Sequence, residues 1–124
     1  MTLLNSILAY ANRIKFKIMD VEQEIKEQIG SNPILLYMKG SPDSPQCGFS
    51  SKATQLLISC GKPFSFVDIL SNPEIRANLH KVSNWPTFPQ LFVDGDLVGG
   101  SDIMVEMHEN GELQKLIDTI ESET

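Results

Sequence analysis

"PILLYMKGSPDSPQCGFSSKATQLLISCGKPFSFVDIL", residues 33–70, contains the pattern that decides the fold. Residues 33–39 are a short apolar run of the kind that forms a buried strand, and residues 40–46 are a polar loop. From Cys47 the apolar residues recur at helical spacing, until a glycine and a proline end the helix. Residues 64–70 alternate as a second strand. Two strands joined through a helix are expected to be parallel, with a right-handed crossover.

A helix is predicted on the N-terminal side of this unit. Asp20 can cap it, with Gln23 three residues later in the pattern of a capping box. Val21, Ile25 and Ile29 then recur every four residues, and a glycine follows as the stop signal. The sequence therefore predicts a helix that begins at Asp20 and precedes the first strand.

The C-terminal side of the unit predicts a further helix and then a hairpin. Residues 72–74, Asn-Pro-Glu, combine a cap, a proline at the first turn and an acid at the positive helix end. Residues 88–93 and 97–100 flank Asp94-Gly95, which is the strongest hairpin signal in the chain. These two strands should therefore be antiparallel.

Two more helices complete the order. Ser101 is expected to cap a helix that runs to about Glu109, and Asn110-Gly111 separates it from a last amphipathic helix near the C-terminus. The predicted order is α-β-α-β-α-β-β-α-α. It implies an α/β protein with one four-stranded mixed sheet and helices on both faces.

Composition excludes several classes of function. The chain has 124 residues, enough for one domain with one core, and a net charge of −6 with no basic stripe, which argues against nucleic-acid binding. No apolar run approaches the ~18 residues of a membrane span. Two cysteines do not make a disulfide scaffold, so a reducing, cytoplasmic location is expected.

The first residues differ in charge from the remainder. Residues 1–19 contain Arg13, Lys15 and Lys17 and no acid; removing this +3 from the total of −6 leaves −9 for residues 20–124. We interpret residues 1–18 as an N-terminal extension, which need be neither ordered nor native, ahead of a domain at 19–124. Organellar import directed by this acid-free segment is the alternative.

Cys47 is the candidate reactive residue. It lies at the start of a predicted helix, where unpaired backbone N–H groups and the helix dipole favour an anion and lower a thiol pKa. Lys39, at the end of the first strand, is placed to add positive charge. Cys60 falls on the apolar face of the helix and is expected to be a core thiol. Neither histidine has metal-ligand spacing with a cysteine, which argues against a zinc site.

Four stretches together resemble a known family. They are "LLYMKG", "CGFS", "WPTFPQLFVDG" and "LVGGSDI", and they occur in the family's order. On these motifs the chain closely resembles the monothiol glutaredoxins from about residue 20 to residue 121. The resemblance implies a thioredoxin-like, three-layer fold and a site that binds glutathione beside Cys47.

The resemblance also implies residues for one half of that glutathione site. The glycyl carboxylate would be held by Lys39 and Arg76. The central cysteinyl unit would pair with the backbone at Phe88, before Pro89, and the Phe88-Pro89 peptide bond is expected to be cis. Taken singly, the two cations could equally be solvated surface charges.

The other half of the implied site lies at the start of the helix near residue 101. The resemblance assigns the γ-glutamyl carboxylate to the helix N-terminus at Ser101 and the ammonium to Asp102. Asp102 could also be an ordinary first-turn acid. Many relatives have a second cysteine directly after the Gly-Gly pair, where this chain has Ser101, so a disulfide from Cys47 by that route is excluded.

The single reactive cysteine suggests what the domain does. Ser50 stands where a dithiol enzyme has its second cysteine, so resolution of a mixed disulfide needs external glutathione. The resemblance implies that a homodimer binds one 2Fe-2S cluster through two Cys47 thiolates and two glutathione thiols, and passes it to iron-sulfur acceptor proteins. Two alternatives remain open: a glutathione-dependent oxidoreductase acting on protein mixed disulfides, and a module that binds a BolA-like protein.

Overall fold

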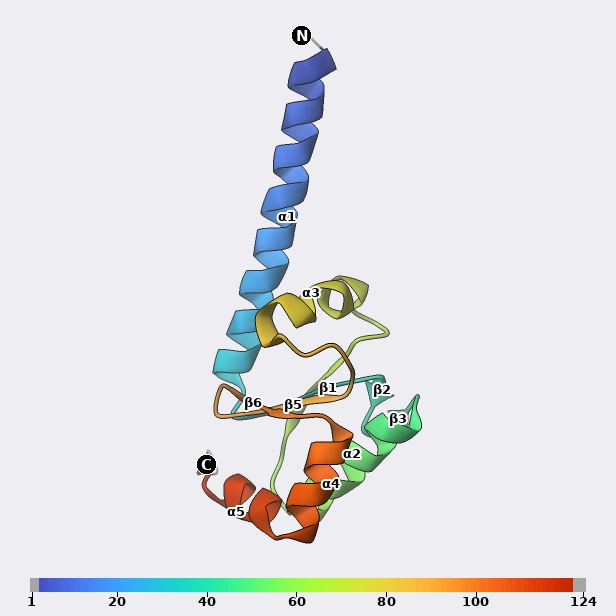
Figure 1. The fold of residues 1–124 in the computed structure, drawn as a ribbon, viewed down its shortest axis with the longest axis vertical. Coiled ribbons are helices and arrows are strands. Elements are labelled where there is room, and N and C mark those ends of the chain that lie inside the picture. Colours follow the sequence, from blue (N-terminus) through green and yellow to red (C-terminus); the bar gives the residue numbers. More distant parts are fainter. Residues whose placement is uncertain (1–2, 122–124) are drawn as a thin grey trace.

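The structure is a computed structural model that describes residues 3–121 (Figure 1). Within these residues the chain forms five helices and six strands. In order, they are α1 (Leu3–Ser31), β1 (Ile34–Met38), β2 (Gly40–Ser41), β3 (Ser44–Pro45), α2 (Gly48–Ser59), β4 (Ser65–Asp68), α3 (Pro73–Ser83), β5 (Gln90–Val93), β6 (Asp96–Gly99), α4 (Ser101–Glu109) and α5 (Glu112–Asp118).

The main sheet has the strand order β4-β1-β5-β6. β1 and β4 are parallel, as the crossover through α2 requires, whereas β1 and β5, and then β5 and β6, are antiparallel. The β5–β6 turn has positive φ at Asp94 (50°) and Gly95 (85°), which is the backbone of a tight hairpin turn. The predicted four-stranded mixed sheet is confirmed.

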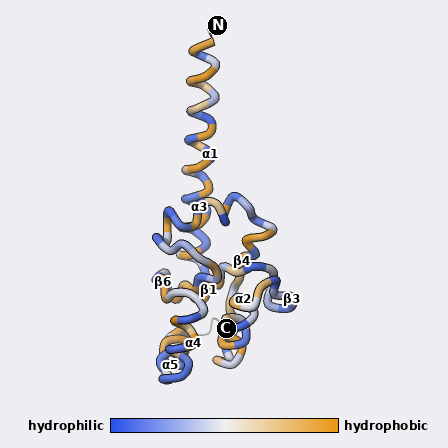
Figure 2. Tube along the Cα trace, turned by 45° about the vertical axis from the view of Figure 1, so that its right-hand side comes forward, coloured by the Kyte–Doolittle hydropathy of each residue, from blue (hydrophilic) through white to orange (hydrophobic). Residues whose placement is uncertain are grey.

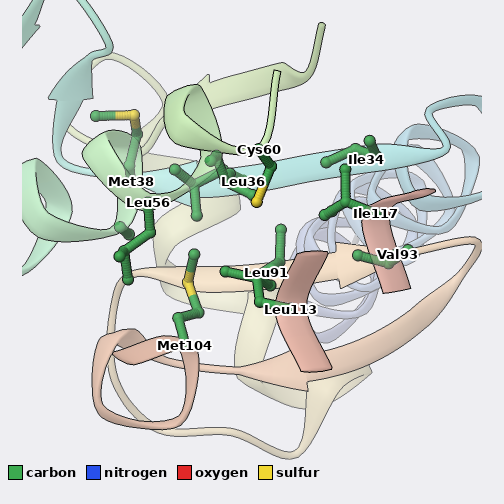
Figure 3. Packing of buried hydrophobic residues seen from close by; sticks show 12 residues of the cluster. Ile34, Leu36, Met38, Leu56, Cys60, Leu91, Val93, Met104, Leu113 and Ile117 are labelled. Carbon is green, nitrogen blue, oxygen red and sulfur yellow. The ribbon is translucent and has the colours of Figure 1, made fainter. Parts of the chain in front are cut away.

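Helices cover both faces of the sheet, so the fold has three layers (Figure 1). Alternate residues of β1 point to opposite faces: Leu36 and Met38 pack with α2, α4 and α5, while Leu35 and Tyr37 pack with α1 and α3. All five residues of β1 are buried, which accounts for its continuous apolar sequence. Figure 3 shows the cluster on the first face, with Cys60 among its aliphatic side chains.

The predicted start of the first helix is wrong. α1 begins at Leu3, so Asp20 is an interior residue and caps nothing. Residues 3–19 contain neither glycine nor proline, so no residue interrupts helix propagation before Asp20. Residues 3–18 of the N-terminal extension are helical, and residues 1–2 lie outside the described part of the chain.

Three local predictions near the strand ends need correction. Gly100, not Ser101, is the N-cap of α4, and Ser101 is its first helical residue. Asn72 stands at the N-cap of α3, but its side chain donates to the Asp68 carbonyl oxygen instead of capping the helix. Within the predicted loop 40–46, β2 and β3 form a short antiparallel pair.

The N-terminal part of α1 projects from the domain. Figure 1 shows it extending far beyond α3, and Figure 2 shows hydrophobic residues recurring along it. Val21, Ile25 and Ile29 are its buried residues, all in the half that lies against the domain. None of the helices within residues 3–121 combines the length and apolar character needed to cross a bilayer.

Candidate functional site

Cys47 is the N-cap residue of α2 and is partly exposed. Its sulfur accepts a hydrogen bond from the Ser50 backbone N–H at 3.2 Å and lies 3.3 Å from the Ser50 hydroxyl oxygen. The same hydroxyl oxygen accepts from the backbone N–H of Lys39 at 3.0 Å. Ser50 is fully buried, and its hydroxyl contacts both the Cys47 sulfur and the backbone that follows β1.

These contacts favour the thiolate form of Cys47. Burial by itself raises the pKa of the thiol, but hydrogen bonds from Ser50 and from the Phe49 backbone, together with the charge of Lys39, outweigh it and leave the pKa lowered. Once the thiolate forms, the Ser50 hydroxyl can donate to it. The sequence predicted the helix start and Lys39 as causes; it missed Ser50, which we had interpreted only as an absent second cysteine.

Ser50→Ala should therefore raise the pKa of Cys47. The variant removes the hydroxyl that stabilises the thiolate and leaves the Lys39 N–H without its acceptor, which should also cost about 1–3 kcal/mol of folding free energy. The measurement is the iodoacetamide alkylation rate against pH in the Cys60→Ser background, and its midpoint should move to higher pH. Ser51→Ala is the control, because the Ser51 hydroxyl accepts from the Gln55 side chain, while the backbone hydrogen bond from Ser51 to the Cys47 carbonyl oxygen is retained in the variant. Equal profiles for Ser50→Ala and Ser51→Ala would contradict the assignment.

A groove of about 680 Å³ lies next to this helix start. Phe49, two residues after the cysteine, forms part of its wall, so the groove reaches the first turn of α2. Such a volume is within the range of small-molecule sites. The lining residues, from five separate segments, are Lys39, Phe49, Arg76, Trp85, Pro86, Thr87, Phe88, Pro89, Gly100, Ser101, Asp102 and Ile103.

The groove brings together all five residues that the resemblance assigned to glutathione. Lys39 comes from the end of β1 and the exposed Arg76 from α3, so both cations lie on the groove wall. Phe88 precedes Pro89, and the peptide bond between them is cis. At the other side, α4 contributes Ser101 and Asp102 from its first turn. Two positive charges and one negative charge thus line a single groove.

Asp68 fixes the end of β1 from the neighbouring strand, and sequence reasoning missed it. Its carboxylate accepts from the Gly40 and Leu70 backbone N–H groups at 2.9 Å each, and from the Ser71 hydroxyl at 2.9 Å. Burial raises the pKa of this carboxyl, but the hydrogen bonds outweigh burial and leave the pKa lowered. Asp68 thereby holds the backbone directly after Lys39.

A second missed residue, Gln90, shapes the wall of the groove. It is fully buried at the start of β5, and its amide nitrogen donates to the carbonyl oxygens of Trp85 and Thr87 at 3.0 Å each. Those two bonds hold the loop that carries Phe88. The only strongly polar residue in the otherwise apolar stretch 88–93 was the signal that could have identified Gln90. The Trp85 indole N–H, also at the groove, is buried and has no hydrogen-bond partner among the described residues.

Cys60 is a core residue, as predicted. Only 7% of it is exposed, and burial followed by the charge of Asp118 raises the pKa of its thiol, despite a hydrogen bond with Ser59. It is therefore a poor nucleophile and a poor partner for Cys47. Within residues 3–121, no group of three or more His, Cys, Asp or Glu side chains is arranged to hold a metal ion.

Comparison with known proteins identifies the family of the chain. The profile described as glutaredoxin matches residues 34–98, which is more than half of the chain. The chain belongs to the glutaredoxin family. With Ser50 in place of a second cysteine, it is a glutaredoxin of the monothiol type. Glutaredoxin 4 of Escherichia coli strain K12 is 64% identical over 95 residues, which cover 77% of this chain and 83% of that protein.

Solved structures show the same fold. The solution structure of reduced poplar apo GrxS14 superposes with a TM-score of 0.70 at 43% identity, over 80% of this chain and 91% of that one. The holo form of glutaredoxin C1 from Populus tremula x tremuloides gives a TM-score of 0.73 at 25% identity, over 82% of this chain and 90% of that one. The thioredoxin-like fold is therefore confirmed.

Proposed function

We propose that this glutaredoxin binds a 2Fe-2S cluster with glutathione and transfers it to acceptor proteins in iron-sulfur biogenesis and iron homeostasis. One observation carries the proposal: a single partly exposed thiol with a lowered pKa lies at the edge of a groove that has charged groups at two of its sides. A thiolate is the form of cysteine that ligates iron. The cluster is the cargo of the protein.

The charges in the groove support glutathione as the second ligand. Glutathione has a carboxylate at each end and an ammonium beside one of them. In the proposal, Lys39 and Arg76 bind the glycyl carboxylate, the backbone at Phe88 pairs with the cysteinyl unit, and α4 binds the γ-glutamyl end through its N-terminus and Asp102. The glutathione thiol would then lie beside Cys47.

The number of ligands supports a dimer. A 2Fe-2S cluster needs four thiolate-type ligands, and one chain offers a single accessible thiol because Cys60 is buried. In the proposal, two chains supply two Cys47 thiolates and two glutathione molecules supply the remaining two. Half of the ligands are then small molecules that exchange with solution, which suits release of the cluster to an acceptor.

Reconstitution with and without glutathione tests the proposal. The apo protein is incubated anaerobically with ferrous iron and sulfide, then desalted, and the visible absorbance and the iron retained are measured. Colour and retained iron are expected only when glutathione, or another small thiol, is present. Equal loading without any small thiol would contradict a glutathione-ligated cluster.

Removing either charge that faces glutathione should weaken cluster retention. Charge-assisted hydrogen bonds contribute about 1.5–3 kcal/mol, which corresponds to a roughly 10- to 150-fold higher glutathione concentration for half-loading of Asp102→Ala. Both Arg76→Ala and Asp102→Ala should lie at the low end of that range, because both side chains are exposed to screening solvent. Glu106→Ala and Lys81→Ala are the matched controls on α4 and α3, since both residues are exposed and lie outside the groove. Unchanged half-loading in both groove variants would argue against the site.

The lowered pKa of Cys47 equally favours a second function, glutathione-dependent reduction of protein mixed disulfides. A glutathione-coupled reductase assay on the apo protein, with a dithiol glutaredoxin as reference, separates the two. We expect weak turnover, because no internal thiol releases the mixed disulfide. Turnover equal to the reference would make the oxidoreductase the main function.

The family resemblance also supports proposals about the domain bounds, the location and a protein partner. We propose that residues 19–124 form the glutaredoxin domain, that the helical residues 3–18 are an addition to it, and that the protein acts in the cytoplasm. A BolA-like protein is proposed as a partner that shares the cluster. Co-purification of the loaded protein with such a partner, compared with the Cys47→Ser variant, tests this last point.

A further inference from the structure

The projecting part of α1 carries a concentration of exposed apolar side chains. Eight of the twelve large hydrophobic residues exposed in the described chain lie between Leu3 and Met19. An exposed concentration of apolar side chains of this extent marks an interaction surface. The helical residues 3–18 therefore need a partner. The eight are Leu3, Leu4, Ile7, Leu8, Tyr10, Ile14, Phe16 and Met19.

The spacing of the apolar residues identifies the kind of partner. Along α1 one line of apolar residues recurs at alternating intervals of three and four, which is the heptad period of a coiled coil, and these residues lie on one side of the helix. Of the eight exposed residues, Leu4, Ile7 and Ile14 belong to this line and the other five lie beside or behind it. We call this line the seam. The seam consists of Leu4, Ile7, Ala11, Ile14, Ile18, Val21 and Ile25.

The seam is covered at one end only. Val21 and Ile25 are buried against the domain, where α1 packs on α3, whereas Leu4, Ile7 and Ile14 are exposed. Because both halves belong to one line, the free half faces the side of α1 on which its own domain lies. A slender helix fits into that space. A flat membrane surface laid against the free half would meet the domain at α3 (Figure 1).

We propose that the free half of the seam pairs with the same half of a second copy of this chain, as an antiparallel two-stranded coiled coil. In a parallel pair in register, the domain of each chain would occupy the space of the other, because the seam faces its own domain. In an antiparallel pair, the domains lie at opposite ends. The basic side chains that flank the seam, Lys15 and Lys17, are then also far from their counterparts, which reduces like-charge repulsion.

The end of the free half nearest the domain borders a notch that can accept the N-terminus of the partner chain. A notch of about 290 Å³ separates α1 from the start of α3. Ile18, Val21, Pro73 and Ala77 supply apolar walls, and Lys17 closes one side through its ion pair with Glu74 at 3.0 Å. In the antiparallel pair, the N-terminal leucines of the partner reach this notch.

This pairing differs from the proposed cluster-bridged dimer. It needs neither Cys47 nor glutathione, and it leaves the groove of each domain free. The apo protein should therefore be dimeric, and a cluster bridging two grooves would join one helix pair to another.

Sedimentation of the iron-free, glutathione-free protein in a non-thiol reductant tests the pairing. The wild-type chain should sediment as a dimer. Ile14→Asp should raise the dimer dissociation constant by at least ~100-fold, since each dimer loses two interfacial isoleucines. Ala9→Asp is the matched control: it introduces the same charge into the same helix, on the side opposite the seam, and should remain dimeric. A monomeric wild type, or equal disruption by both variants, would overturn the proposal.

Two further readouts separate the alternatives. Spin labels at Gln23→Cys, in a Cys47→Ser, Cys60→Ser background, should lie more than about 30 Å apart in an antiparallel pair, given ~1.5 Å of rise per residue; a much shorter distance would overturn the antiparallel arrangement. The wild-type protein is also mixed with phosphatidylcholine vesicles that contain phosphatidylglycerol. Binding to these vesicles by a chain that is monomeric in solution would overturn the pairing in favour of a membrane surface.

Discussion

Cys47→Ser should abolish cluster loading, with less than about a tenth of the wild-type iron retained after anaerobic reconstitution and desalting. Each chain would contribute one ligand to the proposed cluster, and a serine hydroxyl does not replace a thiolate at an iron-sulfur centre. Substitution removes that ligand from both chains of a dimer at once. Glutathione thiols alone would then have to hold the cluster against exchange with solution. The measurement is iron and sulfide content together with the visible absorbance.

Cys60→Ser is the control for this experiment. Cys60 is buried among aliphatic side chains on the face of the sheet covered by α2, α4 and α5 (Figure 3). Its thiol is therefore not accessible to a cluster. The variant should load nearly as much iron as the wild type, after a modest loss of stability from the new buried hydroxyl. Normal loading of Cys47→Ser, or loss of loading in Cys60→Ser alone, would contradict the assignment of the ligand.

Gly40→Ala should destabilise the domain by about 2–5 kcal/mol and disturb the site. Gly40 has φ of 87°, where a side chain costs about 1–2 kcal/mol. An added Cβ would also lie 2.5 Å from the Ser44 carbonyl oxygen and 2.9 Å from the Gln46 backbone nitrogen, an overlap that adds about 1–3 kcal/mol. The residue follows Lys39 directly, so relief of the overlap must move the loop that leads to Cys47. Urea unfolding measures the free energy, and the alkylation rate of Cys47 measures the site.

Gly61→Ala separates the two causes. Gly61 has nearly the same φ, 83°, but an added Cβ there would meet nothing within 4 Å. This variant should cost only the conformational term of about 1–2 kcal/mol and leave the alkylation rate unchanged. Equal losses for Gly40→Ala and Gly61→Ala would show that close packing of the loop at Gly40 contributes nothing.

Local sequence signals were sufficient for most of the fold. The continuous apolar run of β1 reflects burial on both faces, and Asp94-Gly95 has the positive φ values of the hairpin turn that the dipeptide predicted. The error at Asp20 has a physical cause: a residue that can cap a helix does so only where the chain leaves the helical conformation. Nothing between Leu3 and Asp20 stops the helix, so the capping residue remained inside it.

The effects of charge and helix position on the Cys47 thiol could be predicted from the sequence. Contacts between residues that are distant in the sequence could not. Lys39 precedes Cys47 by only eight residues, and its effect on the thiol pKa could be anticipated. The carboxylate of Asp68 reaches Gly40 across 28 positions of sequence, a contact that depends on the parallel pairing of β1 with β4. Ser50 was missed because the absence of a second thiol concealed the hydrogen bonds that its hydroxyl makes with both Cys47 and Lys39.

The composition of the loaded species tests the central proposal most directly. The Ile14→Asp variant, which lacks the proposed helix pairing, is reconstituted with iron, sulfide and glutathione and isolated by size exclusion under anaerobic conditions. Mass, iron, sulfide and glutathione are then measured on the coloured fraction. A glutathione-ligated cluster shared by two chains predicts a coloured dimer with one glutathione and one iron per chain. A coloured monomer, or a coloured dimer without glutathione, would contradict it.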